Sequence, residues 1–108
     1  NIPSFLGLKQ TSQSITADGS STTAVDVTSA ITEINATSAT HTCAMADGSD
    51  GQVKIIINTA TSGTNAITVT PANFSNTSFT LNAPGESVIC LFKNSKWYVI
   101  GGNGFTIA

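Results

Sequence analysis

The chain has 108 residues, 9% of them charged and 40% hydrophobic, and its net charge is −2. This length suits a single domain with one core, and the hydrophobic fraction excludes an intrinsically disordered chain. A chain with four Lys and no Arg lacks the positive surface that nucleic acids require, and no apolar run approaches the roughly 20 residues of a membrane span, so we expect a soluble protein.

Residue usage predicts an all-β protein. The chain holds 17 Thr, 13 Ser, 11 Ile and 6 Val, against 4 Leu and 2 Glu. Side chains branched at Cβ suit the pleated surface of a strand, whereas the scarce residues are good helix formers. Since a surface with so few charges also lacks the repulsion that keeps copies apart, we expect self-association.

Residues 1–13 show neither a period of 2 nor a period of 3.6, and Pro3 and Gly7 interrupt them. We predict an extended N-terminal arm here, followed by a single β domain over residues 14–108. The arm carries four large apolar residues: Ile2, Phe5, Leu6 and Leu8. Because these side chains have no face of their own to bury, we expect the arm to pack on its own domain or on a neighbouring subunit.

Short alternating runs follow, separated by turn signals, as in sandwiches and barrels. Residues 23–28, 30–36 and 41–46 predict strands, and the sequence DGSDG at 47–51 predicts a turn. In the next strand, residues 52–60, three successive Ile predict a central position or cover on both faces. On an exposed edge such a run would invite strand addition from another molecule.

The second half of the chain predicts three more strands and a hairpin. Residues 65–71 alternate, with Ile67 and Val69 facing inward, until Pro71 stops the ladder, residues 77–81 form a short strand, and residues 86–92 and 97–101 flank the loop Lys93–Lys96. No connection is long or helical enough for a parallel crossover. We therefore predict a compact antiparallel β-sandwich or jelly-roll-like β-barrel of about eight short strands, with an extended N-terminal arm.

The hairpin holds the only Trp and the only Tyr of the chain, Trp97 and Tyr98. Neighbours in a strand point to opposite faces, so both rings are buried only if both faces are covered. We expect at least one ring to belong to the core and one to meet a partner or the arm.

The sequence contains no convincing catalytic or metal-binding motif. His41 is the only imidazole, and we predict a strand-edge or surface position for it rather than a general base. His41, Cys43 and Cys90 do not form a zinc motif, and the two carboxylates of the 47–51 turn lack the fuller spacing of a calcium loop. We expect no cofactor, no metal, no small-molecule substrate and no enzymatic activity, with a small hydrolase as the least favoured hypothesis.

The two cysteines leave two alternatives open. Cys43 and Cys90 lie 47 residues apart, and a disulfide could join them if their strands pair. Both also suit small buried apolar positions, since Cys90 stands between Ile89 and Leu91. We favour free thiols.

Three stretches carry a family resemblance: ADGSDGQVKIIINTA, ITVTPANF and APGESVICLFKNSKWYVIGGNGFTIA, within residues 14–108. They resemble small virion structural proteins of tailed phages, many from aquatic environments. That family has an Ala-Asp-Gly turn before a Gly-Gln-x-Lys strand, a Thr-Pro-x-Asn turn, and a Gly-Asp-Ser-Val strand that leads to a Trp-x-hydrophobic-Gly ending. Glu86 replaces the usual Asp, and Gly102 departs from the commoner Gly-Asn-Asn-Gly.

The resemblance implies a capsid decoration (cement) protein on the outer surface of the head. It further implies that the chain binds the major capsid protein and copies of itself, as a small symmetric oligomer for which we expect a trimer. The alternative is a tail or head fibre module that binds a glycan of the host surface, with Trp97 or Tyr98 as a stacking platform. The residues predicted for partner interfaces are Ile2, Phe5, Leu6, Leu8, Trp97, Tyr98 and Phe105.

Overall fold

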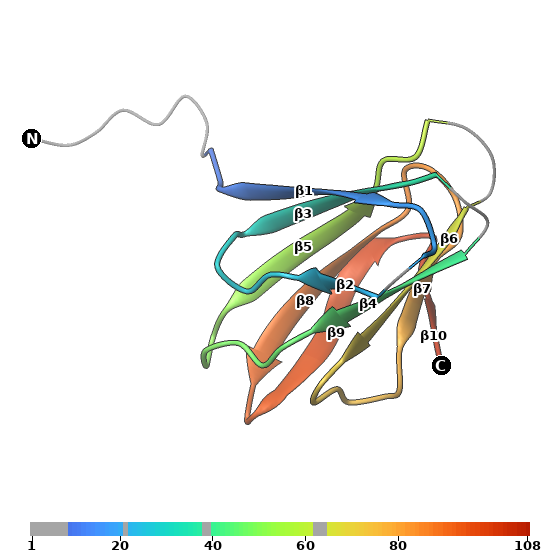
Figure 1. Ribbon diagram of the computed structural model, residues 1–108. Coiled ribbons are helices and arrows are strands. Elements are labelled where there is room, and N and C mark those ends of the chain that lie inside the picture. The colour runs from blue at the N-terminus through green and yellow to red at the C-terminus, as the bar shows by residue number, and fades with distance from the viewer. Residues whose placement is uncertain (1–8, 21, 38–39, 62–64) are drawn as a thin grey trace, which may run out of the picture.

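The computed structural model describes residues 9–20, 22–37, 40–61 and 65–108, which form ten strands in two layers (Figure 1). The strands are β1 (Ser12–Ala17), β2 (Thr23–Val25), β3 (Ile31–Ala36), β4 (Thr40–Met45), β5 (Val53–Asn58), β6 (Ala66–Pro71), β7 (Phe79–Leu81), β8 (Ser87–Lys93), β9 (Lys96–Asn103) and β10 (Thr106–Ile107). The all-β prediction is confirmed. In these residues there is no helix of the length and hydropathy that a membrane span needs.

The strands form two five-stranded sheets. Sheet A has the order β1-β3-β5-β8-β9, and sheet B has the order β10-β7-β6-β4-β2. From β1 to β6 the chain alternates between the sheets, so β1, β3 and β5 pair in parallel in sheet A, as do β2, β4 and β6 in sheet B. The prediction of an antiparallel fold is therefore wrong for this half. Each parallel crossover is made by a strand of the opposite sheet, which needs no helix.

The second half of the chain is antiparallel. β6 pairs with β7, β8 pairs with β5 and β9, and β10 pairs with β7. The predicted hairpin is present, with a turn of two residues: Asn94 and Ser95 adopt φ angles of 52° and 64°. Two successive positive φ values are typical of the turn that matches the twist of a hairpin.

Three expectations about the elements need correction. The described residues hold ten strands instead of about eight, because β1 and β10 were not predicted: the start of β1 lies within the predicted arm, and β10 is only two residues long. The strand predicted over 23–28 ends at Val25, because Asp26 turns away to bond with Ser29 and Lys54. β1 begins at Ser12, inside the range of the predicted arm, and the arm residues Ile2, Phe5, Leu6 and Leu8 lie outside the described residues.

The core lies between the sheets and takes alternate residues of each strand. Ile67 and Val69 point inward from β6, as predicted, and are fully buried. β5 lies at the centre of sheet A, as its run of isoleucines predicts. Its inward residues are Ile56, Lys54 and Asn58, and all three are fully buried. Burial of Lys54 and Asn58 is unusual for polar side chains.

Candidate functional site

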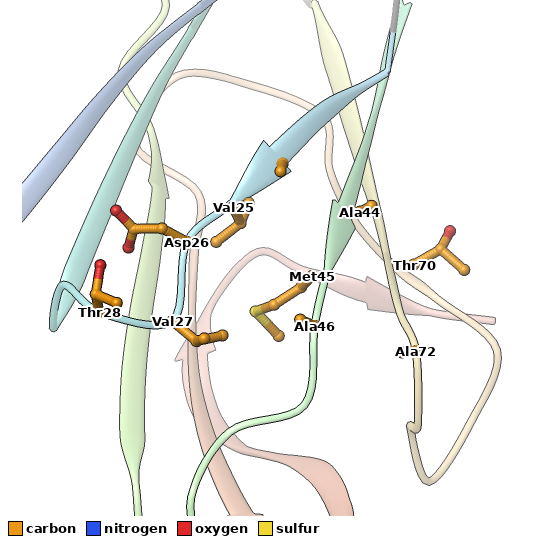
Figure 2. Close-up of a pocket in the computed structure, with 10 residues that line it drawn as sticks. Val25, Asp26, Val27, Thr28, Ala44, Met45, Ala46, Thr70 and Ala72 are labelled. Atoms are coloured by element: carbon orange, nitrogen blue, oxygen red, sulfur yellow. The ribbon is translucent and has the colours of Figure 1, made fainter.

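An apolar groove of about 540 Å³ lies beside the end of β2 (Figure 2). It forms where β2 and β4 both end, at the paired residues Val25 and Met45, because the chain that leaves β2 diverges there from the chain that leaves β4. Figure 2 shows Val27 and Met45 pointing toward each other across the opening. The groove is lined by Ala24, Val25, Asp26, Val27, Thr28, Ala44, Met45, Ala46, Thr70 and Ala72.

One wall of the groove is held by a buried ion pair between Lys54 and Asp26. Lys54 has no exposed side-chain surface, and its Nζ donates to Asp26 Oδ1 at 3.1 Å and to the Ser29 carbonyl oxygen at 2.7 Å. Asp26 also accepts bonds from the Ser29 amide, at 3.0 Å, and from the Ser29 hydroxyl, at 3.1 Å. The pair ties the β2–β3 connection to the centre of sheet A.

Burial lowers the pKa of Lys54 below its ordinary 10.5, and the nearby Asp26 carboxylate offsets only part of this effect. Burial also acts to raise the pKa of Asp26, but the hydrogen bonds and charge of Lys54 and the bonds from Ser29 outweigh it and bring the pKa below 3.8. The Asp26 carboxyl is therefore ionised at neutral pH. The carboxylate is occupied by its own chain, so the groove offers shape and apolar contact rather than a reactive group.

His41 is not at a strand edge or on the surface, which corrects the prediction. The residue is 5% exposed, and its side chain points inward from β4. Nδ1 accepts a hydrogen bond from the Gly19 amide at 2.9 Å, so the proton of the neutral ring sits on Nε2, which lies 2.9 Å from Thr23 Oγ1. In this tautomer the ring donates to the Thr23 hydroxyl and cannot take its proton. The imidazole holds the β1–β2 turn in place, next to a polar hollow of about 280 Å³.

The two carboxylates of the 47–51 turn point to different partners. Both oxygens of Asp47 accept bonds from Asn73 Nδ2, at 2.9 and 2.8 Å. Asp50 forms an ion pair with Lys93 at 2.8 Å, and this bond lowers the pKa of the Asp50 carboxyl. No group of three or more metal-ligating side chains gathers anywhere in the described ranges. The turn fastens two loops to the end of the sheets.

Trp97 lies inside the core of its own chain, with none of its surface exposed. Its Nε1 donates to the Ala46 carbonyl oxygen at 2.9 Å, and its ring packs edge-on against Phe92 with centroids 5.1 Å apart. Gly48 lies against the indole, where an added Cβ would be 2.7 Å from Cζ2. The prediction that Trp97 contacts a partner or a glycan is therefore wrong for the folded chain.

The other two described interface candidates lie elsewhere. Tyr98 is on the outer face of sheet A and is 37% exposed, whereas Phe105 is half-buried against the edge of the core. A contact of either ring with a partner stays a prediction. The structure therefore does not bring Trp97, Tyr98 and Phe105 together into one surface site.

Cys43 and Cys90 are unbridged and fully buried, which confirms the prediction of free thiols. Cys43 points inward from sheet B and Cys90 points inward from sheet A. Burial raises the pKa of the Cys43 thiol to about 11 and that of the Cys90 thiol to about 12.

We expect these thiols to react with a water-soluble disulfide reagent only when the chain unfolds, because the attacking species is the exposed thiolate. At pH 8 the labelling rate of the folded protein should be at least about a hundredfold below that in concentrated urea. The labelling rate should rise with urea concentration in parallel with the fraction of unfolded chain. Labelling of the folded protein at a rate close to that of the unfolded chain would contradict this expectation.

A search against protein-family models and curated sequences finds no match to this chain. Sequence reasoning missed the groove and the ion pair at its wall. Lys54 could have indicated the ion pair from the sequence. It lies two residues before Ile56 in the same strand, so the two side chains point to the same face, and a charged residue on the face of Ile56 needs a partner.

Proposed function

We propose that this chain is a non-enzymatic structural protein of a phage virion, which decorates the outer surface of the capsid and stabilises the head. Its partners are then the major capsid protein and copies of itself. The resemblance of residues 14–108 to small virion proteins supports this role. The carrying observation is that His41, Asp26, Lys54 and Trp97 are bonded within the chain, so that the polar groups fix a rigid block.

Such a block is suited to a particle exterior, because packing, internal hydrogen bonds and the Lys54–Asp26 ion pair stabilise it from within. The trimer implied by the resemblance stays a prediction, as does the location on the head. The fibre alternative now depends on Tyr98 as its stacking platform, because Trp97 is buried.

Removal of the N-terminal arm tests the proposal. β1 begins at Ser12, and Gln13 accepts bonds from Thr32 and from the Asp26 amide, so a cut within 1–13 should spare residues 9–13. We expect a chain without residues 1–8 to remain folded and to lose most of its occupancy on heads that lack the native protein, because the arm supplies much of the apolar contact area.

Occupancy is measured by sedimenting the heads with the added chain and quantifying the bound copies. The control is a Ser4→Ala variant of the full chain, which keeps the four apolar side chains of the arm and should bind fully. Unchanged occupancy without residues 1–8 would remove the arm from the proposal. Failure of the full chain to bind any head would overturn the virion role itself.

A further inference from the structure

We propose that a second copy of this chain covers the outer face of sheet A. This surface, here named the isoleucine face, consists of Ile31, Val53, Ile55, Ile89, Leu91 and Tyr98. The inference goes beyond the virion role, because it concerns the isolated protein and holds whether or not the chain binds a head.

The register of the strands places these side chains in two continuous rows. Ile31 pairs with Ile55, which pairs with Ile89, and this row crosses β3, β5 and β8. Val53 pairs with Leu91, which pairs with Tyr98, and the second row crosses β5, β8 and β9. Val53 is 46% exposed and Tyr98 37%, while the other four are half-buried by their neighbours. Adjacent outward positions on four strands are thus apolar.

The outer face of sheet B shows that this is not a general property of the fold. The corresponding outward positions of β4, β6 and β7 carry five Thr and two Ala: Thr40, Thr42, Ala44, Ala66, Thr68, Thr70 and Thr80. Thr68 and Thr80 are hydrogen-bonded to each other through their hydroxyls, with the oxygens 3.1 Å apart. The outer face of sheet B thus carries hydroxyls and small Ala side chains where the outer face of sheet A carries large apolar ones, and contiguous exposed apolar surface commonly marks an interface.

The charges around the isoleucine face favour a copy of the same chain as its occupant. Glu33 lies on β3 in the row of Ile57 and Ser87, at one corner of the face, and is exposed. Lys96 lies on β9 in the row of Lys93, at the diagonally opposite corner, and is also exposed. Within the described part of the chain the ion pairs are Lys54–Asp26 and Lys93–Asp50, so Lys96 is unpaired there.

A two-fold axis between the two copies would pair the charges at both corners of the face. When the axis lies in the plane of the face and perpendicular to the line from Glu33 to Lys96, each Glu33 comes opposite the Lys96 of the other copy. The apolar rows then meet each other between the two ion pairs, as a self-complementary two-fold interface requires. This pairing differs from the trimer that the resemblance implies.

The face is small, which sets the expected affinity. The face spans about 15 Å across its four strands and about 20 Å along them, from the Glu33 row to the Lys96 row, which is about 300 Å² per copy. The total of about 600 Å² is below the usual size of a specific interface, so only weak pairing is expected. We therefore expect pairing in the micromolar range or weaker. The experiment is sedimentation equilibrium of the full chain from about 10 μM to about 1 mM at low ionic strength.

The first comparison is Val53→Lys with Thr42→Lys, which place the same charge on the isoleucine face and on the outer face of sheet B. The first variant should remain monomeric over the whole range, and the second should pair like the native chain. Circular dichroism and urea unfolding establish that both are folded. Equal pairing of the two variants would overturn the proposal, as would a native chain that stays monomeric at the highest concentration.

Charge reversal tests the identity of the occupant. Glu33→Lys and Lys96→Glu should each weaken pairing by about tenfold, and the double variant should restore it, because the two corners exchange signs. Absence of this rescue would overturn the two-fold arrangement, and so would a mass of three chains. If the native chain is monomeric and removal of residues 1–8 alone causes pairing, the arm covers the face and the proposal fails.

Discussion

Asp26→Asn is expected to lower the free energy of unfolding by about 3 kcal/mol, because it leaves the buried ammonium of Lys54 without its counterion. Lys54 has no exposed side-chain surface, whereas the side chain of Asp26 is 32% exposed. An unpaired charge is far more costly at the enclosed position than at the open one. Urea unfolding at pH 7 and low protein concentration measures the loss.

The matched control is Lys54→Met, which removes the buried charge and leaves Asp26 with its bonds from Ser29 and access to water. We expect a smaller loss than for Asp26→Asn, and a double variant with both changes should be more stable than Asp26→Asn alone. Equal losses in the two single variants would contradict the asymmetry on which this expectation depends.

The pH dependence of the same variants follows from the direction of the Lys54 shift. The pKa of Lys54 is lower in the folded chain than in the unfolded chain, so the unfolded chain binds this proton more strongly and stability rises with pH toward 10.5. Loss of the Asp26 charge lowers the pKa of Lys54 in the folded chain further, so the pH range over which stability rises becomes wider. The difference between native chain and Asp26→Asn should therefore shrink from pH 7 to pH 10.

The Asp26 carboxyl makes the stability of the native chain depend on pH in the acid range as well. Its pKa lies below 3.8 in the folded chain, so its contribution is fully present above the unfolded pKa and is lost as the pH falls through the folded value. The native chain should thus lose this part of its stability below about pH 4, and Asp26→Asn should not.

Trp97→Ala is expected to have the second large effect, a loss of about 3 to 5 kcal/mol. The indole is fully buried and packs against Phe92. Its backbone also joins the sheets: the Trp97 amide donates to the Asn73 carbonyl oxygen at 2.9 Å, and its own carbonyl oxygen accepts from the Ser75 amide at 3.0 Å. Truncation leaves a cavity at the point where β9 meets the β6–β7 connection.

Tyr98→Ala is the control, since it removes a neighbouring ring of the same strand that points outward. We expect a loss below about 1 kcal/mol in dilute solution, where copies do not pair. Unfolding of the two variants in urea at a few micromolar compares them directly. If Tyr98→Ala proved as costly as Trp97→Ala, the assignment of the inner and outer faces of β9 would be wrong.

Alternation along each strand predicted a large part of this fold. A period of two shows which residues share a face, so Ile67 and Val69 could be assigned to the core from the sequence. The turn residues marked the hairpin correctly, and the run of isoleucines at 55–57 identified a central strand. Local chemistry determines these features, because they depend on neighbours in the chain.

The same alternation does not say which strand lies beside which. Parallel pairing of β1, β3 and β5 depends on the chain crossing to the opposite sheet between them, and no residue within a strand records that path. His41 and Lys54 were misplaced or overlooked for a related reason. Each is buried because a distant segment supplies its hydrogen bonds, Gly19 in one case and Asp26 with Ser29 in the other.

The amino-acid sequence by itself determined an all-β chain, most strand positions and the hairpin turn. Only the tertiary structure decided that Trp97 is core while Tyr98 is surface, that an ion pair borders the groove, and that apolar residues gather on one outer face. The physical reason is that strand parity is a local property of the chain. Burial of a given face is decided by what the rest of the chain places against it.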